Sequence, residues 1–263
     1  MRAAKDWLTI VPFAALPAIG HAQTEGDLAK QLANPISSLI SVPFQSNFEL
    51  DVGDDEGFRY TLNTQPVIPF AITQHWNLIS RTILPTVYQA GVLPGMGDQL
   101  GLGDTVQSLF FSPRQPGPRG WIWGVGPVLL LPTATDDVLG SDQWGAGPTG
   151  VVLKQEGPWT YGLLANHIDS VSGGDDRPEV NSTFLQPFLS RSNGSVTYSG
   201  TVEASYDHEA DEWTVPLVLT VSEVTRIGSQ RLSYGGGLKL YADGPEGAPT
   251  WGIRAFITLL YPR

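Results

Sequence analysis

The last stretch of the chain, TWGIRAFITLLYPR, alternates between two kinds of side chain. Every second residue belongs to one face: Trp251, Ile253, Ala255, Ile257, Leu259 and Tyr261. The other face carries Gly252, Arg254 and Thr258 together with Phe256 and Leu260. In a soluble sheet this pattern places one face on a core and the other in water. In a membrane barrel it places one face in lipid and the other in a lumen.

Eleven further apolar or alternating segments precede this one, separated by turn residues. The twelve begin near residues 41, 57, 75, 103, 120, 143, 158, 179, 195, 212, 230 and 250. VTYSGTVEASYD, FRYTLNTQPVI and EWTVPLVLTVS alternate clearly, whereas the segments at Val106 and Trp121 are apolar or mixed on both faces. A period of roughly 20 residues suits a tilted spanning strand of about 9–11 residues and its connection.

When the twelve segments are numbered in order, the connections that follow odd-numbered segments differ in length and charge from those that follow even-numbered segments. Odd-to-even connections are mostly long and acidic, as in QAGVLPGMGDQLGLGD, TATDDVLGSDQ and SVSGGDDRPE. Even-to-odd connections, such as SPRQPGPR, KQEG and SRSNG, are mostly shorter and carry more of the basic residues. A soluble sandwich has no reason to sort its loops in this way, whereas an outer-membrane barrel has short periplasmic turns and long extracellular loops.

Aromatic residues fall at two matching depths along the segments. Trp76, Trp121 and Trp159 lie near the ends with short turns, and Trp144, Trp213 and Trp251 near the ends with long loops. With Tyr261 they form two girdles of interface aromatics, as expected around the apolar band of a barrel in lipid. The sequence therefore predicts an all-β protein, an antiparallel up-and-down transmembrane β-barrel of about 12 strands.

The beginning of the chain has a different character. Residues 1–22 have Arg2 and Lys5, an apolar stretch and then small residues, the layout of a secretory signal peptide cleaved after Ala22. The alternative is a short buried helix. Residues 23–40 predict a short helix with Asp27 as its N-cap and a break at Pro35, either periplasmic or plugging the barrel. The barrel is expected over residues 41–263.

The amino-acid composition excludes several other classes of protein. The 263 residues include 30 Gly and 21 Pro but only 16% charged residues, which favours many turns over a helical bundle. A net charge of −11 excludes nucleic acid as a natural partner, because binding phosphates needs a basic surface. The absence of cysteine excludes a disulfide scaffold and a thiolate metal site.

Several stretches resemble one bacterial family. They include LAKQLANPISSLISVPFQ, LNTQPVIPF, GWIWGVGPVLLLPTATD, WGAGPTGVVLKQEGPWTYGLLANHI and WGIRAFITLLYP, in order along the mature chain. They are similar to an outer-membrane transporter family, also called the MetA-pathway of phenol degradation family and often misnamed neuromedin U. The resemblance implies a barrel in the outer membrane of a Gram-negative bacterium, and it implies little chemistry.

Two short motifs could carry chemistry. NHIDS offers His167, Asp169 and Ser170, but neighbours on a strand point to opposite faces, so Asn166 and His167 cannot share a site without a bulge. DHEADE could hold a divalent cation through carboxylates, although a solvated acidic loop is the simpler interpretation. No catalytic residue, metal site or cofactor is therefore predicted, and the protein is not expected to be an enzyme.

Polar residues at the alternate strand positions that face the barrel interior are the candidates for lining a lumen. They are Gln45, Asn47, Glu49, Arg59, Asn63, Gln65, Arg81, Lys154, Glu203, Asp207, Lys239 and Arg254. Such charges can line a selective constriction or fill the interior as a salt-bridge network.

Two functions are consistent with this lumen. One is a narrow channel or transporter for small molecules, including hydrophobic or aromatic ones; the alternative is a structural surface barrel with acidic loops and no open pore. The expected partners are outer-membrane lipid and lipopolysaccharide, the barrel-assembly machinery through the C-terminal strand, and a small-molecule substrate.

Overall fold

The computed structural model describes residues 23–262 except 54 and 175, so the predicted signal peptide lies outside the described residues. The elements in chain order are α1 (Glu25–Leu32), β1 (Ile40–Val52), β2 (Gly57–Thr64), β3 (Val67–Ala71), β4 (Trp76–Ala90), β5 (Gln99–Leu102), β6 (Thr105–Pro113), η1 (Pro118–Gly120), β7 (Trp121–Leu131), β8 (Gln143–Glu156), β9 (Trp159–Gly173), β10 (Asn181–Asn193), β11 (Val196–Val202), β12 (Ala204–Asp207), β13 (Glu212–Thr214), β14 (Pro216–Ile227), β15 (Gln230–Tyr241) and β16 (Trp251–Tyr261). No helix in the described part of the chain is long and apolar enough to cross a membrane.

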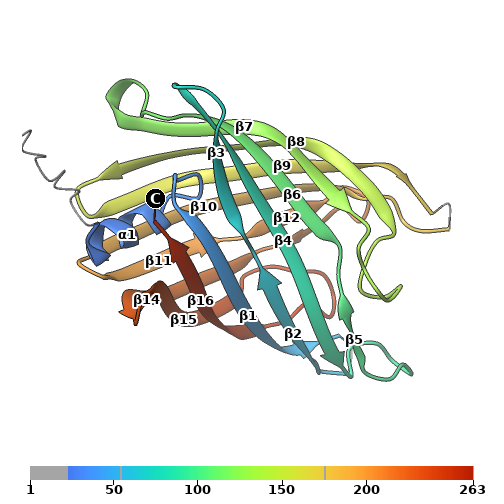
Figure 1. Ribbon diagram of the computed structural model, residues 1–263. Helices are drawn as coiled ribbons and strands as arrows, with labels where there is room; N and C mark the ends of the chain where they lie inside the picture. Colours follow the sequence, from blue (N-terminus) through green and yellow to red (C-terminus); the bar gives the residue numbers. More distant parts are fainter. Residues whose placement is uncertain (1–22, 54, 175, 263) are drawn as a thin grey trace, which may run out of the picture.

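These strands form one closed antiparallel barrel (Figure 1). Four wall strands are broken in two, as β2/β3, β5/β6, β11/β12 and β13/β14, so that the wall contains twelve strands. The barrel closes where β1 pairs with β16, from Ile40 opposite Tyr261 to Leu50 opposite Trp251. The prediction of a twelve-stranded antiparallel barrel is confirmed.

Five prolines lie at or beside positions where a hydrogen-bond ladder is interrupted. Pro66 separates β2 from β3, and Pro216 follows the break between β13 and β14. Pro187 lies where β10 changes its partner from β12 to β11. Pro127 and Pro148 face each other across β7 and β8, and the neighbouring ladders skip these positions. Because proline has no N–H to donate, these breaks accept it with little loss of pairing.

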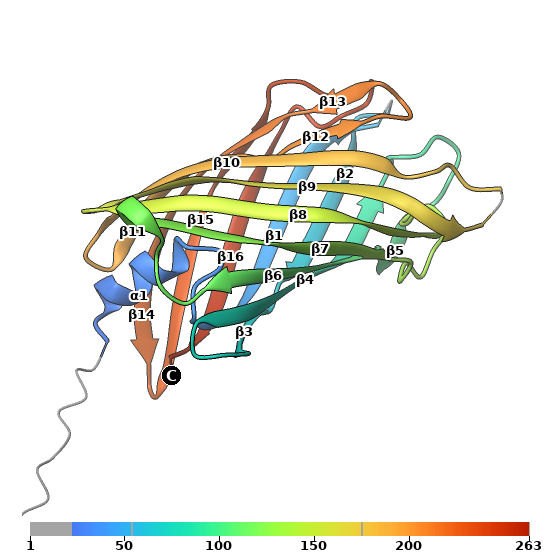
Figure 2. The ribbon, with the colours of Figure 1, turned by 90° about the horizontal axis from the view of Figure 1, so that it is seen from above.

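The two ends of the barrel differ (Figure 2). Residues 91–98, 132–142, 174–180 and 242–250 connect strands at one end, which we call the loop end. Residues 157–158, 194–195 and 228–229 connect strands at the other, the turn end, where α1 and the last strand also finish (Figure 1). Residues 72–75 and 114–120 also connect strands at the turn end, and residues 53–56 and 208–211 at the loop end. The connections at the loop end are therefore mostly the longer ones, as the parity in the sequence predicts.

Side chains of the wall alternate between the outer face and the lumen. On β16, Ile257 is 52% exposed on the outer face, whereas Arg254 and Thr258 are 7% and 5% exposed and face inward. Large apolar side chains are exposed around the outer face, for example Phe48, Val125 and Leu219. The closing strand therefore has the two faces expected from its alternation.

Helix α1 lies inside the barrel at the turn end. Its N-cap is Thr24, whose hydroxyl accepts a hydrogen bond from the backbone N–H of Asp27, and Asp27 bonds back to Thr24 as the N3 residue of a capping box. The expectation that Asp27 itself is the N-cap is therefore wrong by one turn. These bonds from Thr24 lower the pKa of the Asp27 carboxyl below its ordinary value.

Apolar residues anchor this N-terminal segment in the lumen. Leu28 and Ala29 of α1, together with Leu39, pack against Val224 and Leu260 on the inner wall. Farther along, Ile36 packs against Phe110 and approaches Gly124, where a Cβ atom would lie 3.3 Å from the end of its side chain. Residues 25–39 form what we call the plug.

Candidate functional site

One half of the lumen wall is filled by apolar side chains. These residues come from β4, β6, β7, β8 and β9 and form two clusters, which we call the apolar sector: Ile79, Phe110, Val128, Leu130, Val151, Leu153, Leu164 and Ile168. All of them are buried. They pack as the core of a soluble protein does, and they leave this half of the lumen closed to water.

The opposite half, the polar sector, is formed by β1, β2, β11 and β14–β16, and it carries buried charges. Arg254 reaches from β16 to Glu203, which lies in the break between β11 and β12, with two N–O distances of 2.7 and 2.9 Å. Its Nε donates to Asn47 Oδ1 at 2.8 Å. This two-pronged geometry is the strong form of an arginine–carboxylate pair.

A second ion pair lies nearer the loop end. Lys239 Nζ is 2.6 Å from Glu49 Oε1, and the Tyr241 hydroxyl donates to the same oxygen. Arg59 is opposite Glu49 in the β1–β2 ladder, and its Nε donates to Gln89 Oε1 at 3.2 Å. Gln89 in turn donates to Gln99 at 3.0 Å. The buried polar groups are thus joined across several strands, which holds the side chains in fixed positions.

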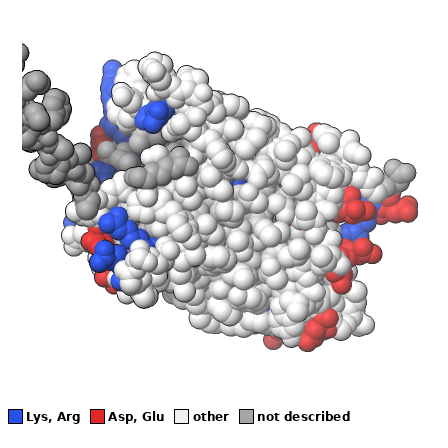
Figure 3. Space-filling view, in the orientation of Figure 1, with Lys and Arg blue, Asp and Glu red and all other residues white. Residues whose placement is uncertain are grey.

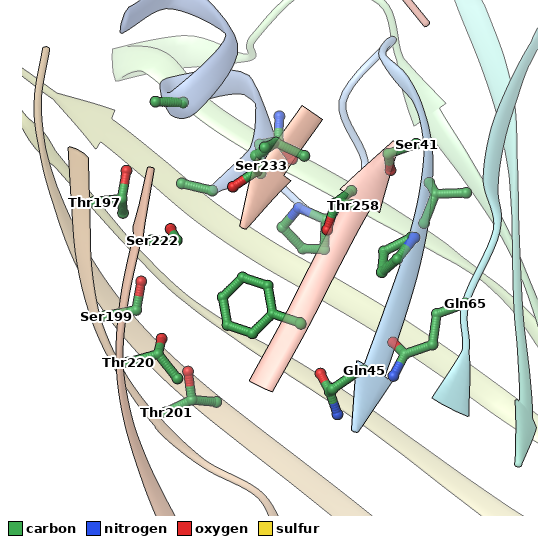
Figure 4. Close-up of a pocket in the computed structure, with 18 of the residues that line it drawn as sticks. Ser41, Gln45, Gln65, Thr197, Ser199, Thr201, Thr220, Ser222, Ser233 and Thr258 are labelled. Atoms are coloured by element: carbon green, nitrogen blue, oxygen red, sulfur yellow. The ribbon is translucent and has the colours of Figure 1, made fainter. Parts of the chain in front are cut away.

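A cavity of about 300 Å³ lies between the plug and the Arg254–Glu203 pair. Figure 4 shows hydroxyls of β11 and β14 on one side, the amides of Gln45 and Gln65 on the other, and the helix above them. The residues with hydroxyl groups along this wall are Ser41, Thr197, Ser199, Thr201, Thr220, Ser222, Ser233 and Thr258. Its volume is at the lower end of the range for small-molecule sites.

Arg81 of β4 also lines this cavity. Its Nη2 donates to Gln65 Oε1 at 3.4 Å. Among the described residues, no carboxylate oxygen lies within 4.0 Å of an Arg81 nitrogen. Glu203 attracts Arg81 from beyond this distance while both of its oxygens bind Arg254, so Arg81 faces the cavity without an ion pair of its own among the described residues.

Most of the predicted lumen residues lie together in this half of the barrel. Five of them line the cavity: Gln45, Gln65, Arg81, Glu203 and Arg254. Asn47, Glu49, Arg59 and Lys239 belong to the polar network above it. Asn63 is opposite Gln45 in the β1–β2 ladder, on the same inner face.

Two predicted lumen residues lie elsewhere. Lys154 is on the outer face near the turn end, where its ammonium lies 5.8 Å from the ring centroid of Trp121 and pairs with Glu156. Its assignment to the lumen is wrong, because Val151 and Leu153 occupy the inward positions of β8. This segment is apolar on both faces, so its parity is hard to read from the sequence. Asp207 is exposed at the loop end and accepts the backbone N–H groups of the following turn.

Other lumen residues are missing from the sequence prediction. Gln89 lies on the same parity as Arg81 along β4, and Tyr241 lies two residues after Lys239. That spacing is enough to place both side chains in the lumen. No local signal identifies Gln99, because it contacts Gln89 from the short strand β5 across a loop.

The histidines of the two motifs considered for chemistry lie outside the lumen. His167 Nδ1 and His208 Nε2 are each 2.9 Å from the hydroxyl of Thr183, on the outer face near the loop end. Asn166 belongs to the opposite face of β9, as alternation requires. Within the described residues, no group of three or more His, Cys, Asp or Glu side chains could hold a metal ion.

The outer surface has aromatic residues near both rims and separated charge. Trp76, Trp121 and Trp159 start strands at the turn end, and Trp144 and Trp251 lie at the loop-end termini of β8 and β16. In Figure 3 acidic residues predominate at the loop end, basic residues mixed with some acidic ones lie at the turn end, and the band between them is nearly free of charge. Arg177 joins two acidic loops by donating to the carbonyls of Gly140 and Asp137.

Comparison with known proteins gives a fold but no family. No family model and no curated protein matches the sequence. The structure is similar to an outer membrane channel from Pseudomonas putida F1, with a TM-score of 0.65 and 14% identity, covering 85% of this chain and 96% of the channel. This likeness shows a shared barrel fold.

Two further solved structures match less well. The outer membrane phospholipase A from Escherichia coli has a TM-score of 0.48 and 10% identity, over 92% of this chain and 99% of that chain. The beta domain of the Bordetella autotransporter BrkA has a TM-score of 0.46 and 11% identity, over 85% and 99%. These scores add nothing to the fold already described.

Proposed function

We propose that this protein is an outer-membrane β-barrel of a Gram-negative bacterium, exported by a signal peptide at residues 1–22. The support is the uncharged band on the outer face, where side chains such as Phe48 and Ile257 are exposed. A contiguous apolar surface of this kind is unfavourable in water and favourable in lipid. Lipid and lipopolysaccharide are the partners of this band.

A lysine pair on β16 tests this location. Ile257→Lys places a charge on the lipid face and costs roughly 2–4 kcal/mol at mid-membrane, whereas Thr258→Lys points to the cavity and avoids that cost. We expect folded Ile257→Lys protein to be strongly reduced in outer-membrane fractions and Thr258→Lys protein to be abundant. If Thr258→Lys were the less abundant variant, the outer face would not lie in lipid.

The orientation we propose places the acidic loop end outside the cell and the turn end in the periplasm. The support is the length and charge of the two sets of connections. A protease-cleavable tag inserted after Gly173 is expected to be cut on intact cells, and one inserted after Asn193 is expected to survive. Cleavage of the second tag alone would reverse the orientation.

The barrel takes up small molecules through its polar sector. The observation that carries this proposal is the cavity of about 300 Å³, which is lined by hydroxyl, amide and guanidinium groups inside a closed wall. Purified mature protein in planar bilayers is expected to pass a small, steady ionic current. Its absence would favour the second candidate, a structural surface barrel, which the plug and the filled apolar sector support.

Membership of the MetA-pathway transporter family is the narrower proposal, supported by the stretches that resemble it in order along the chain and by the barrel fold. Assembly is proposed to use the barrel-assembly machinery through β16, since this strand closes the wall against β1. Removing LLYPR leaves part of β1 unpaired in lipid and should abolish assembly. Normal levels of the truncated barrel would contradict this.

A further inference from the structure

Charge in the middle of the lumen is opposite in sign to charge on the whole chain. Four bases, Arg59, Arg81, Lys239 and Arg254, share this region with two acids, Glu49 and Glu203. Both oxygens of Glu203 bind Arg254, and Glu49 binds Lys239. These six described residues therefore carry an excess of two positive charges in a protein whose net charge is −11.

Arg81 brings this excess charge to the cavity wall. A guanidinium has five N–H donors, and the one bond described for Arg81 runs to Gln65 over 3.4 Å. A cation enclosed in a protein is costly unless an anion pairs with it. Glu203 attracts Arg81 from beyond 4.0 Å, but both of its oxygens bind Arg254, so an anion in the cavity could pair with Arg81 directly.

Apolar side chains also line the cavity. Phe256, Pro43, Val67 and Val218 line it, and Leu32 of the plug faces the same space. The ring of Phe256 lies over Gly235, where an added Cβ would come within 2.7 Å of it. A ligand that fits these surfaces needs a short apolar body in addition to its charge.

We propose that the cavity binds a small organic carboxylate, with the carboxylate on Arg81 and the apolar body against Phe256 and Val218. This inference rests on the proposed uptake function and specifies its substrate class. The arginine fork matches the two oxygens of a carboxylate, and the hydroxyls of β11 and β14 can donate to them. A neutral molecule of the same shape lacks the ionic part of this recognition.

Butanoate and butanamide test this directly, because they have nearly the same size and differ in charge. Mature protein is placed in planar bilayers, and the reduction of the potassium chloride current is titrated with each compound. We expect butanoate to half-block the current at a concentration at least about tenfold below that of butanamide. Equal blocking by the two compounds would overturn the carboxylate assignment and leave the uptake function intact.

Variants connect the effect to Arg81. Arg81→Gln should raise the half-blocking concentration of butanoate about tenfold and leave that of butanamide unchanged. Lys154→Gln is the matched control, since it removes the same charge from the outer face and should change neither. Arg81→Lys keeps the charge but loses the fork, so it should lie between wild type and Arg81→Gln. Wild-type blocking by Arg81→Gln protein would overturn the proposal.

Two further measurements distinguish a loss of binding from misfolding and from a failure of the uptake function. Folding of each variant is checked by the shift in gel migration on heating, and Arg81→Lys carries the test if Arg81→Gln fails to fold. If wild type passes no current, the uptake function fails, and isothermal titration calorimetry of the folded barrel decides the binding proposal. Heat from butanoate that butanamide does not produce supports it, and equal or absent heats contradict it.

Discussion

The wall formed by β6–β9 and the wall formed by β14–β16 and β1 face each other across one barrel, yet they bury different chemistry. In the apolar sector, Phe110, Leu153 and Leu164 pack against each other and against the plug. In the polar sector, Arg254 pairs with Glu203 across strands, and a cavity remains beside them. The first half resembles a protein core and the second a binding site.

This difference shows how a small barrel can be stable and still keep a polar cavity in its lumen. Dense apolar packing contributes free energy in proportion to the surface removed from water. Paired buried charges contribute less, because desolvation offsets much of their attraction. We therefore expect stability to depend mainly on the apolar sector, and binding and conduction to depend mainly on the polar sector.

The largest expected effect comes from placing a charge in each half. Leu164→Lys introduces an ammonium with no acidic partner into the apolar sector, at a cost on the order of several kcal/mol. Thr258→Lys can extend its ammonium into the cavity. The fraction of refolded protein that resists SDS without heating should fall sharply for the first variant and little for the second. Similar fractions would mean that the two halves of the lumen tolerate an added charge equally well.

Truncation to alanine gives the next effect. Phe110→Ala removes a fully buried ring from the apolar sector and should lower the free energy of unfolding by about 3–5 kcal/mol. Thr220→Ala, on the cavity wall, should lower it by less than about 1 kcal/mol. Urea unfolding in detergent micelles measures both, and a larger loss for Thr220→Ala would reverse the comparison.

The smallest effect concerns the Glu49–Lys239 pair. In a double-mutant cycle with Glu49→Gln and Lys239→Gln, the coupling free energy should be about 1–3 kcal/mol, because the two groups are buried and share hydrogen bonds. Equilibrium unfolding of the two single variants and the double variant gives this value. A coupling near zero would show that the polar sector holds its charges independently.

The barrel follows from the sequence more completely than the lumen does. Strict alternation fixes the two faces of β16, so the pattern alone is enough to assign Arg254 and Thr258 to the lumen. Lys154 is misplaced by the same reasoning because β8 is apolar on both faces, and there the packing of Val151 and Leu153 decides the parity. The pairing of Arg254 with Glu203 depends on a break in the wall that local patterns do not reveal.

Cysteine labelling tests the division of the lumen most directly, because the chain contains no cysteine. Single variants Ser199→Cys and Thr220→Cys place a thiol on the cavity wall, whereas Val151→Cys and Leu164→Cys place one in the apolar sector. We predict that a small water-soluble methanethiosulfonate labels the first two in the folded barrel and leaves the last two unmodified, as read by mass spectrometry. Equal labelling of both pairs, or labelling of the apolar sector alone, would contradict the account.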